Sequence, residues 1–183
     1  RGALEKAGVT TEQLLENLCE VKQEMAKEEG RAGRSVETAF GHIDADVLLA
    51  GIATESPSAA SRVILEASEL TLLDLLASRK VLDECERNLS EVAPEEPVLG
   101  ALRQSFREVV ARAVEVVDDP ASLSSIPETD PKDVIHITSA VSHDCDFLVT
   151  YNVSDYPRSH EGTTVAEPGT LVKRIREQIR DLD

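Results

Sequence analysis

Apolar residues follow two different spacings along the chain, and together these spacings predict strands that alternate with helices. A short, continuous apolar run predicts a buried strand at residues 147–149. We expect further strands near residues 40–44, 70–75, 113–117 and 163–166. Apolar residues at helical spacing predict helices over about 56–68, 79–89, 98–111, 131–141 and 171–179. Such alternation is typical of a parallel sheet with helices on both faces. We therefore expect a three-layer α/β/α domain whose central parallel sheet has four to five strands.

A separate amphipathic segment precedes this pattern. Thr10, with Gln13 three residues later, forms a capping box that starts a helix. One face of this helix is apolar and carries Leu14, Leu18, Val21 and Met25. Gly30 ends the helix, and residues 31–35 (Arg-Ala-Gly-Arg-Ser) read as a basic, flexible linker. The sequence therefore predicts an N-terminal appendage over residues 1–37 and the α/β domain over residues 38–183.

Composition narrows the class of protein. No apolar run approaches the roughly 18 residues of a membrane helix, and no signal peptide is evident. Cys19, Cys85 and Cys145 are widely spaced and predict neither a metal site nor a disulfide framework, which favours the cytoplasm. The net charge of −16 is unusual for a protein that binds nucleic acid, because phosphate binding relies on Lys and Arg. A salt-rich cytoplasm, a basic partner or a carboxylate-rich metal site would each explain it, and a solvated acidic surface is the simplest explanation.

Four acidic residues stand at predicted strand ends or on the adjoining helices: Asp44, Glu84, Asp133 and Asp155. Open α/β sheets place ligands at the carboxyl ends of their strands. Carboxylates gathered there repel one another, and a hard divalent cation takes their oxygens as ligands. With a cation bound, such a cluster can hold an attacking water and stabilise the charge that develops on a phosphodiester. No Ser-His-Asp spacing, Cys-His pair or Gly-rich phosphate loop competes with this interpretation.

Four segments, in this order, resemble the PIN domain: residues 43–48, 81–89, 130–136 and 148–157. The chain is similar over about residues 40–160 to the toxin ribonucleases of VapBC-type toxin–antitoxin pairs. The resemblance implies a PIN-like fold, often dimeric, and an endoribonuclease that uses Mg²⁺ or Mn²⁺ to cut RNA. It implies that the metal ligands are Asp44, Glu84, Asp133 and Asp155. It also implies a site role for the polar residues after the fourth strand, Thr150 and Asn152.

Two positions depart from the family pattern. Asp46 stands where many relatives have Asn, which adds a negative charge beside the predicted metal site. Some members carry their fourth acid where Asn152 stands here, so the roles of Asn152 and Asp155 could be exchanged.

Residues 1–37 resemble the tail of a small antitoxin, in which an amphipathic helix is followed by arginines. We hypothesise that the apolar stripe covers a groove on the nuclease while Arg31 or Arg34 approaches Asp44. An accessory helix or a contact between two copies of the chain is an equal alternative.

Simpler interpretations exist for several of these residues. Glu84 has acidic neighbours on a helix that can face solvent, and Asp155 can serve a turn. The four histidines are assigned to packing or to the surface: His42, His136, His143 and His160. The cations of the last helix could contact RNA phosphates, although the negative end of the helix dipole explains them more simply: Lys173, Arg174, Arg176 and Arg180.

Two other functions remain open at this stage. The first is a non-catalytic binding or regulatory module that keeps the PIN fold. The second is an aspartyl-phosphate enzyme or receiver using Asp44 or Asp46, which is disfavoured because no strand-end Lys stands opposite these acids.

Overall fold

The computed structural model describes residues 39–123, 125–127 and 129–180. The predictions made for residues 1–37, namely the capped helix, the basic linker and the domain boundary, lie outside the described residues.

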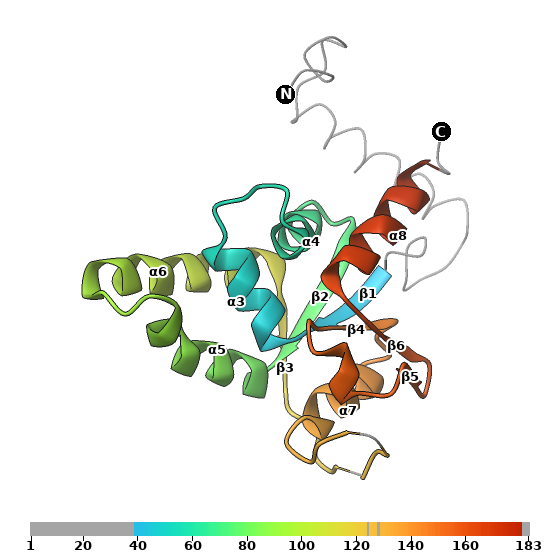
Figure 1. The fold of residues 1–183 in the computed structure, drawn as a ribbon. Helices are drawn as coiled ribbons and strands as arrows, with labels where there is room; N and C mark the ends of the chain where they lie inside the picture. The colour runs from blue at the N-terminus through green and yellow to red at the C-terminus, as the bar shows by residue number, and fades with distance from the viewer. Residues whose placement is uncertain (1–38, 124, 128, 181–183) are drawn as a thin grey trace. The chain divides into compact units, whose positions relative to one another are not determined.

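The described part of the chain alternates strands and helices around one sheet (Figure 1). In chain order the elements are β1 (Ala39–Ile43), α3 (Ala45–Ala53), α4 (Ala60–Glu69), β2 (Leu73–Ser78), α5 (Arg79–Val92), α6 (Glu96–Ala113), β3 (Glu115–Val117), α7 (Val134–Ser142), β4 (Phe147–Val149), the 3₁₀ turn η1 (Val153–Asp155), β5 (Ser159–His160), β6 (Thr163–Ala166) and α8 (Pro168–Arg180).

The strand order in the sheet is β3-β2-β1-β4-β6-β5. All neighbouring strands are parallel except β5, which runs antiparallel to β6. The predicted parallel sheet is therefore confirmed, with one strand more than expected. That strand, β5, has only two residues and pairs through the tight turn at Glu161 and Gly162, both of which have positive φ. Two residues are too few to produce a periodic signal in the sequence.

The two faces of the sheet are covered unequally (Figure 1). Helices α3, α4, α5, α6 and α8 pack on the face that carries Leu75 and Val149. Helix α7 packs on the other face, against Leu76 and Leu148. This arrangement gives the predicted three layers. Each fully buried aliphatic side chain contributes about 1.5–3 kcal/mol relative to an exposed one, so the core holds the strand ends in fixed positions.

The turn predicted after Asp44 is wrong, because helix α3 starts at Ala45. Asp44 is its N-cap, and its Oδ1 accepts a hydrogen bond from the amide of Ala45 at 2.7 Å. The helix was missed because it is packed between neighbours and has almost no polar face. Its buried side chains include Val47, Leu48, Leu49 and Ile52. A helix buried on all sides gives no amphipathic pattern.

Three predicted boundaries also shift. Strand β2 begins at Leu73 rather than at residue 70, because the Leu72 amide still donates to Ala67 in the turn that ends α4. Helix α4 begins at Ala60, after a turn at residues 57–58. Helix α7 begins at Val134 rather than at residue 131, since the Asp130 carboxylate and carbonyl hold residues 131–133 in a turn.

Within the described residues, none of the helices has the length and apolar character needed to cross a membrane.

The close packing of α3 on α4 predicts opposite effects for two Gly→Ala substitutions. A Cβ at Gly51 would lie 2.6 Å from Leu65 Cδ1 and 2.9 Å from the Ser61 carbonyl oxygen, so backbone must move. We expect Gly51→Ala to destabilise the protein by about 1–3 kcal/mol. Gly100, in helix α6, has no atom within 4 Å of such a Cβ, so Gly100→Ala should stabilise by about 0.5–1 kcal/mol. Guanidinium denaturation of both variants tests this, and equal effects would contradict it.

Candidate functional site

The carboxyl ends of β1 and β4 lie side by side, and this fixes the position of the first acidic residue. Ile43 pairs with Val149 in the parallel register. The backbone amide of Asp44 then donates to the Val149 carbonyl at 3.0 Å. Asp44 follows β1 directly and Thr150 follows β4 directly, so both residues lie at the same edge of the sheet. Asp44 is buried, with 7% of its surface exposed.

The Asp46 carboxylate ties the first turn of α3 to the loop after β4. Its Oδ2 accepts hydrogen bonds from the Tyr151 amide at 3.1 Å, the Asn152 side-chain amide at 3.1 Å and the Thr150 hydroxyl at 3.4 Å. The Thr150 hydroxyl also accepts from the Asn152 amide at 3.0 Å. The other oxygen, Asp46 Oδ1, is buried and has no hydrogen-bond partner among the described residues. The two predicted polar residues of the site, Thr150 and Asn152, are therefore organised by Asp46.

Asp46 carries a perturbed charge. Burial of the carboxyl, followed by the nearby Asp44 carboxylate, raises its pKa from 3.8 to about 6. Hydrogen bonds from the Tyr151 amide and the Thr150 hydroxyl oppose this shift but do not cancel it. At neutral pH the site thus holds carboxylates that repel each other.

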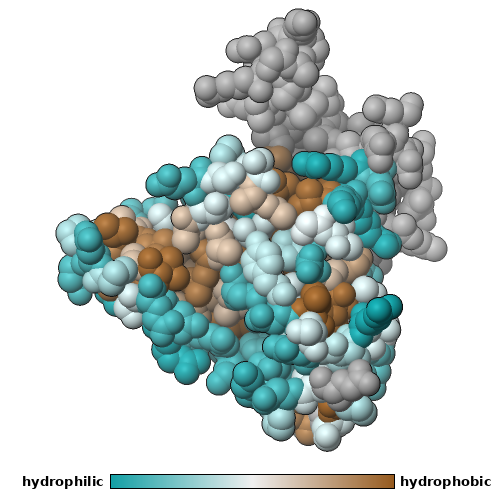
Figure 2. Space-filling view, viewed as in Figure 1, coloured by the Kyte–Doolittle hydropathy of each residue, from teal (hydrophilic) through white to brown (hydrophobic). Residues whose placement is uncertain are grey.

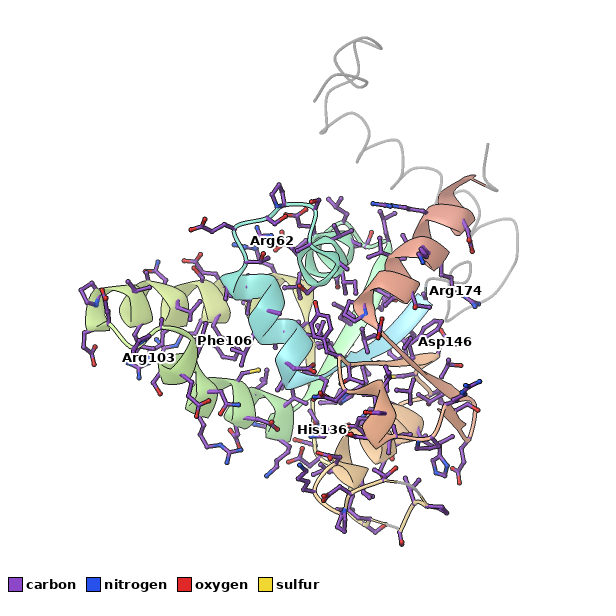
Figure 3. All side chains as sticks on the ribbon, viewed as in Figure 1. Arg62, Arg103, Phe106, His136, Asp146 and Arg174 are labelled. Carbon is purple, nitrogen blue, oxygen red and sulfur yellow. The ribbon has the colours of Figure 1, made fainter. Side chains whose placement is uncertain are left out.

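His136 of α7, labelled in Figure 3, lies between two of the predicted acids, as the distances below show. Its Nδ1 is 4.0 Å from Asp44 Oδ1, and its Nε2 is 3.8 Å from Glu84 Oε2 on α5. Both distances are too long for direct hydrogen bonds. His136 is only 3% exposed, and its Nδ1 has no hydrogen-bond partner within the described part of the chain. The imidazole of His136 therefore has a carboxylate from a different element on each side.

Asp133 and Asp155 belong to the same neighbourhood. Partial burial raises the pKa of Asp133. The charges of Lys132 and His136 oppose this shift, whereas those of Asp130 and Asp155 add to it. The Lys132 ammonium lies 3.9 Å from Asp133 Oδ2. Asp155 is exposed on η1, where its Oδ1 accepts a hydrogen bond from the Ser154 hydroxyl at 3.2 Å.

The buried phenol of Tyr156 connects these groups electrostatically. Burial raises its pKa, and four carboxylates raise it further, in the order Asp44, Asp133, Asp46 and Asp155. Only 6% of Tyr156 is exposed. One side chain thus experiences the field of all four aspartates, which come from three separate segments of the sequence.

His42, on β1, has a structural role behind this site. Burial lowers its pKa to about 3, with smaller effects from His136 and His143. Its Nε2 accepts from the Ser78 amide at 3.3 Å, which requires the neutral imidazole. The assignment of His42 to packing agrees with this burial.

The six predicted site residues thus fall into three groups of neighbours. Asp46 contacts Thr150 and Asn152, His136 connects Asp44 with Glu84, and the field at Tyr156 includes Asp133 and Asp155. The sequence did not predict that His136 and Tyr156 lie beside the acidic residues. His136 follows Asp133 by three residues, so the two can share a helix face, and this spacing was the available signal.

The types of side chain present suit a hard divalent cation, which prefers carboxylate oxygens. The buried Oδ1 of Asp46 adds an oxygen that accepts no hydrogen bond from the described residues. In the ranges that the structure describes, no group of three or more His, Cys, Asp or Glu side chains is arranged closely enough to hold a metal ion. The donor chemistry therefore fits a metal, while the side-chain positions do not define a ligand shell.

Comparisons with known proteins agree with this architecture. A family model described as the PIN domain matches residues 42–154, which is more than half of the chain. PAE2754 from Pyrobaculum aerophilum is similar in structure, with a TM-score of 0.54 and 16% identity over 77% of this chain and 98% of its own. VapBC2 from Rickettsia felis, solved with a DNA fragment from its promoter, has a TM-score of 0.51 and 15% identity over 70% of this chain and 98% of its own. None of the curated proteins matches the chain.

The raised pKa of Asp46 predicts a pH-dependent effect of Asp46→Asn. Because the folded-state pKa of about 6 lies above the unfolded value of 3.8, ionising Asp46 costs stability. The cost is absent below the unfolded pKa, grows as the pH rises through this window, and is complete above it. Asparagine removes the charge and keeps an acceptor oxygen. The free energy of unfolding of the variant, relative to the parent, should therefore increase from pH 4 to pH 7 in EDTA.

Guanidinium denaturation of both proteins at the two pH values measures this difference. A difference that is the same at pH 4 and pH 7 would show that the Asp46 carboxylate is not destabilised by burial and by Asp44.

Proposed function

The chain belongs to the PIN domain family, and from this premise we propose that it is a metal-dependent endoribonuclease and the toxin of a toxin–antitoxin pair. Members of the family are generally nucleases, which supports hydrolysis of a phosphodiester bond. The observation that carries the proposal is that acidic side chains from separate elements lie near one another. Asp44 and Glu84 are on either side of His136, and four aspartates, Asp44, Asp46, Asp133 and Asp155, act on the buried phenol of Tyr156. The VapBC2 structure of Rickettsia felis, which is similar in fold, motivates the toxin assignment.

We assign distinct roles to the residues of the site. Asp44, Glu84, Asp133 and Asp155 would hold Mg²⁺ or Mn²⁺, which when bound activates water and offsets negative charge on the phosphate. Asp44 is oriented for this role by its bond from the Ala45 amide. His136 keeps Asp44 and Glu84 on either side of one ring. Asp46 fixes the Thr150 hydroxyl and the Asn152 side-chain amide, and the second N–H of that amide would donate to the substrate phosphate. A carboxylate of the set accepts the proton of the attacking water.

A second candidate is a non-catalytic binding or regulatory module with the same fold. Two observations favour it: Asp46 stands where many relatives have Asn, and the described side chains do not form a closed ligand set. Such a module would bind its partner without cutting RNA and would not respond to a divalent cation.

We further propose that the protein acts in the cytoplasm as a homodimer and is held inactive by an antitoxin segment. That segment is either a separate chain or residues 1–37, whose Arg31 or Arg34 would approach Asp44. The sequence pattern alone supports this part of the proposal. Removing residues 1–37 should raise the cleavage rate, and an unchanged rate in a folded protein would argue for an accessory helix or a dimer contact instead.

Neutralising two of the acids tests the catalytic proposal. We expect Asp44→Asn and Glu84→Gln to lower the rate of RNA cleavage at least about a hundredfold, since each removes a carboxylate that would hold the divalent cation. The assay follows a labelled, single-stranded RNA in Mn²⁺, and circular dichroism confirms that each variant is folded.

Two exposed residues supply matched controls. Asp74→Asn on β2 and Glu91→Gln on α5 make the same chemical changes on the same kinds of element, and they should leave the rate unchanged. Parental activity in either site variant, or equal losses in the controls, would refute the assignment.

A further inference from the structure

A groove of about 1060 Å³ lies beside the acidic site, between α8 and η1, and crosses the ends of β4 and β6. Its floor is apolar and includes Phe147, Val165 and Ala166. Its walls are polar, with Thr170 of α8 on one side and Ser154 of η1 on the other. Figure 2 shows hydrophobic side chains exposed below α8, with hydrophilic side chains around them. Small-molecule pockets usually measure about 300–1,000 Å³, so the groove has room for a segment of a chain.

Three cations line this groove, and none of them forms an ion pair within the described residues: Arg158, Lys173 and Arg174. All three side chains are exposed. The carboxylates in the lining are those of Glu167 and Glu177. The groove therefore carries more positive than negative charge, although the whole chain has a net charge of −16. Cations without partners are available to an anionic ligand.

Arg174 is held at the floor of the groove by an aromatic ring. Its guanidinium carbon lies 5.3 Å from the centroid of the Phe147 ring, which is the distance of a cation–π contact. Figure 3 shows Arg174 on α8, beside the sheet. Because Phe147 is buried on β4, the guanidinium is positioned by a rigid element and keeps its N–H donors for a ligand.

The groove reaches the segment that carries Asp155. Val153 and Ser154 of η1 line the groove, and the next residue is Asp155. The buried side chain of Tyr156, on the other side of Asp155, also lines it. A strand lying in the groove would therefore pass beside Asp155.

We propose that this groove binds the backbone of a single-stranded RNA next to the bond that is cut, with Arg158, Lys173 and Arg174 contacting its phosphates. The inference rests on the proposed nuclease function and adds where the strand lies. A groove that combines cations with apolar surface is the usual solution for binding single strands. An acidic peptide could also bind these cations, but it has no phosphodiester bond for the neighbouring acidic site to cut.

Charge reversal on α8 tests the proposal with a matched control. We would measure binding of a fluorescent, single-stranded 12-nucleotide RNA to the full chain in EDTA by anisotropy, at several salt concentrations. Arg158→Glu, Lys173→Glu and Arg174→Glu should each weaken binding about tenfold, and each should reduce the slope of log Kd against log salt by about 0.7–1. Arg176→Glu makes the same charge change on α8 but faces the α4 side, where it lines a different pocket, so it should weaken binding less than twofold.

The outcomes separate the groove from the nuclease. If the parent cuts RNA but the groove variants bind and cut like the parent, the groove assignment is wrong and the nuclease stands. If the parent binds RNA through these cations but does not cut it, the nuclease proposal fails and the groove stands. If Arg176→Glu weakens RNA binding as much as the groove variants do, the effect arises from net charge and the groove assignment is wrong. No RNA binding by the parent, or displacement of RNA by poly-glutamate at equal residue concentration, would also overturn the groove assignment.

Discussion

Repulsion between carboxylates is the constraint on which the rest of this structure depends. Parallel strands end at the same edge of the sheet, and Asp44 and Thr150 follow two neighbouring strands directly. Asp46 follows as the second residue of α3, and burial and the nearby Asp44 carboxylate raise its pKa to about 6. The surrounding aliphatic core keeps these groups together despite the repulsion, because moving them apart would expose buried apolar surface. Such stored repulsion is expected where a site awaits a positive charge.

Hydrogen bonds to Asp46 fix the position of its carboxylate, and His136 separates Asp44 from Glu84, but neither removes the repulsion between the carboxylates. Three donors meet at Asp46 Oδ2, so the loop after β4 is fixed relative to α3. His136 lies between Asp44 and Glu84 at distances that leave space on both sides. The buried Oδ1 of Asp46 and Nδ1 of His136 have no hydrogen-bond partner among the described residues. Unsatisfied buried groups of this kind are uncommon in proteins and concentrate at functional sites.

The sequence predicts elements that have a local pattern of apolar residues, and it does not predict features that depend on tertiary packing. Strand β4 lies at residues 147–149 as predicted, because a buried strand leaves a continuous apolar run. Helix α3 was missed because burial on all sides removes its amphipathic period. The place of Glu84 depends on a contact with His136, 52 residues away along the chain, which no local pattern encodes. Lys173, Arg174 and Arg176 lie on α8, but the groove that separates Lys173 and Arg174 from Arg176 depends on tertiary packing, which the sequence does not show.

A titration with Mn²⁺, followed through the melting temperature of the full chain in metal-free buffer, tests the central claim most directly. A cation that binds the folded state alone stabilises it, by about 2.7 kcal/mol at a hundred times its Kd. The account predicts a saturable rise in melting temperature for the parent and for Asp74→Asn, and little or no rise for Asp44→Asn. A melting temperature that does not change with Mn²⁺, or that changes equally in all three proteins, would contradict a cation site built from these carboxylates.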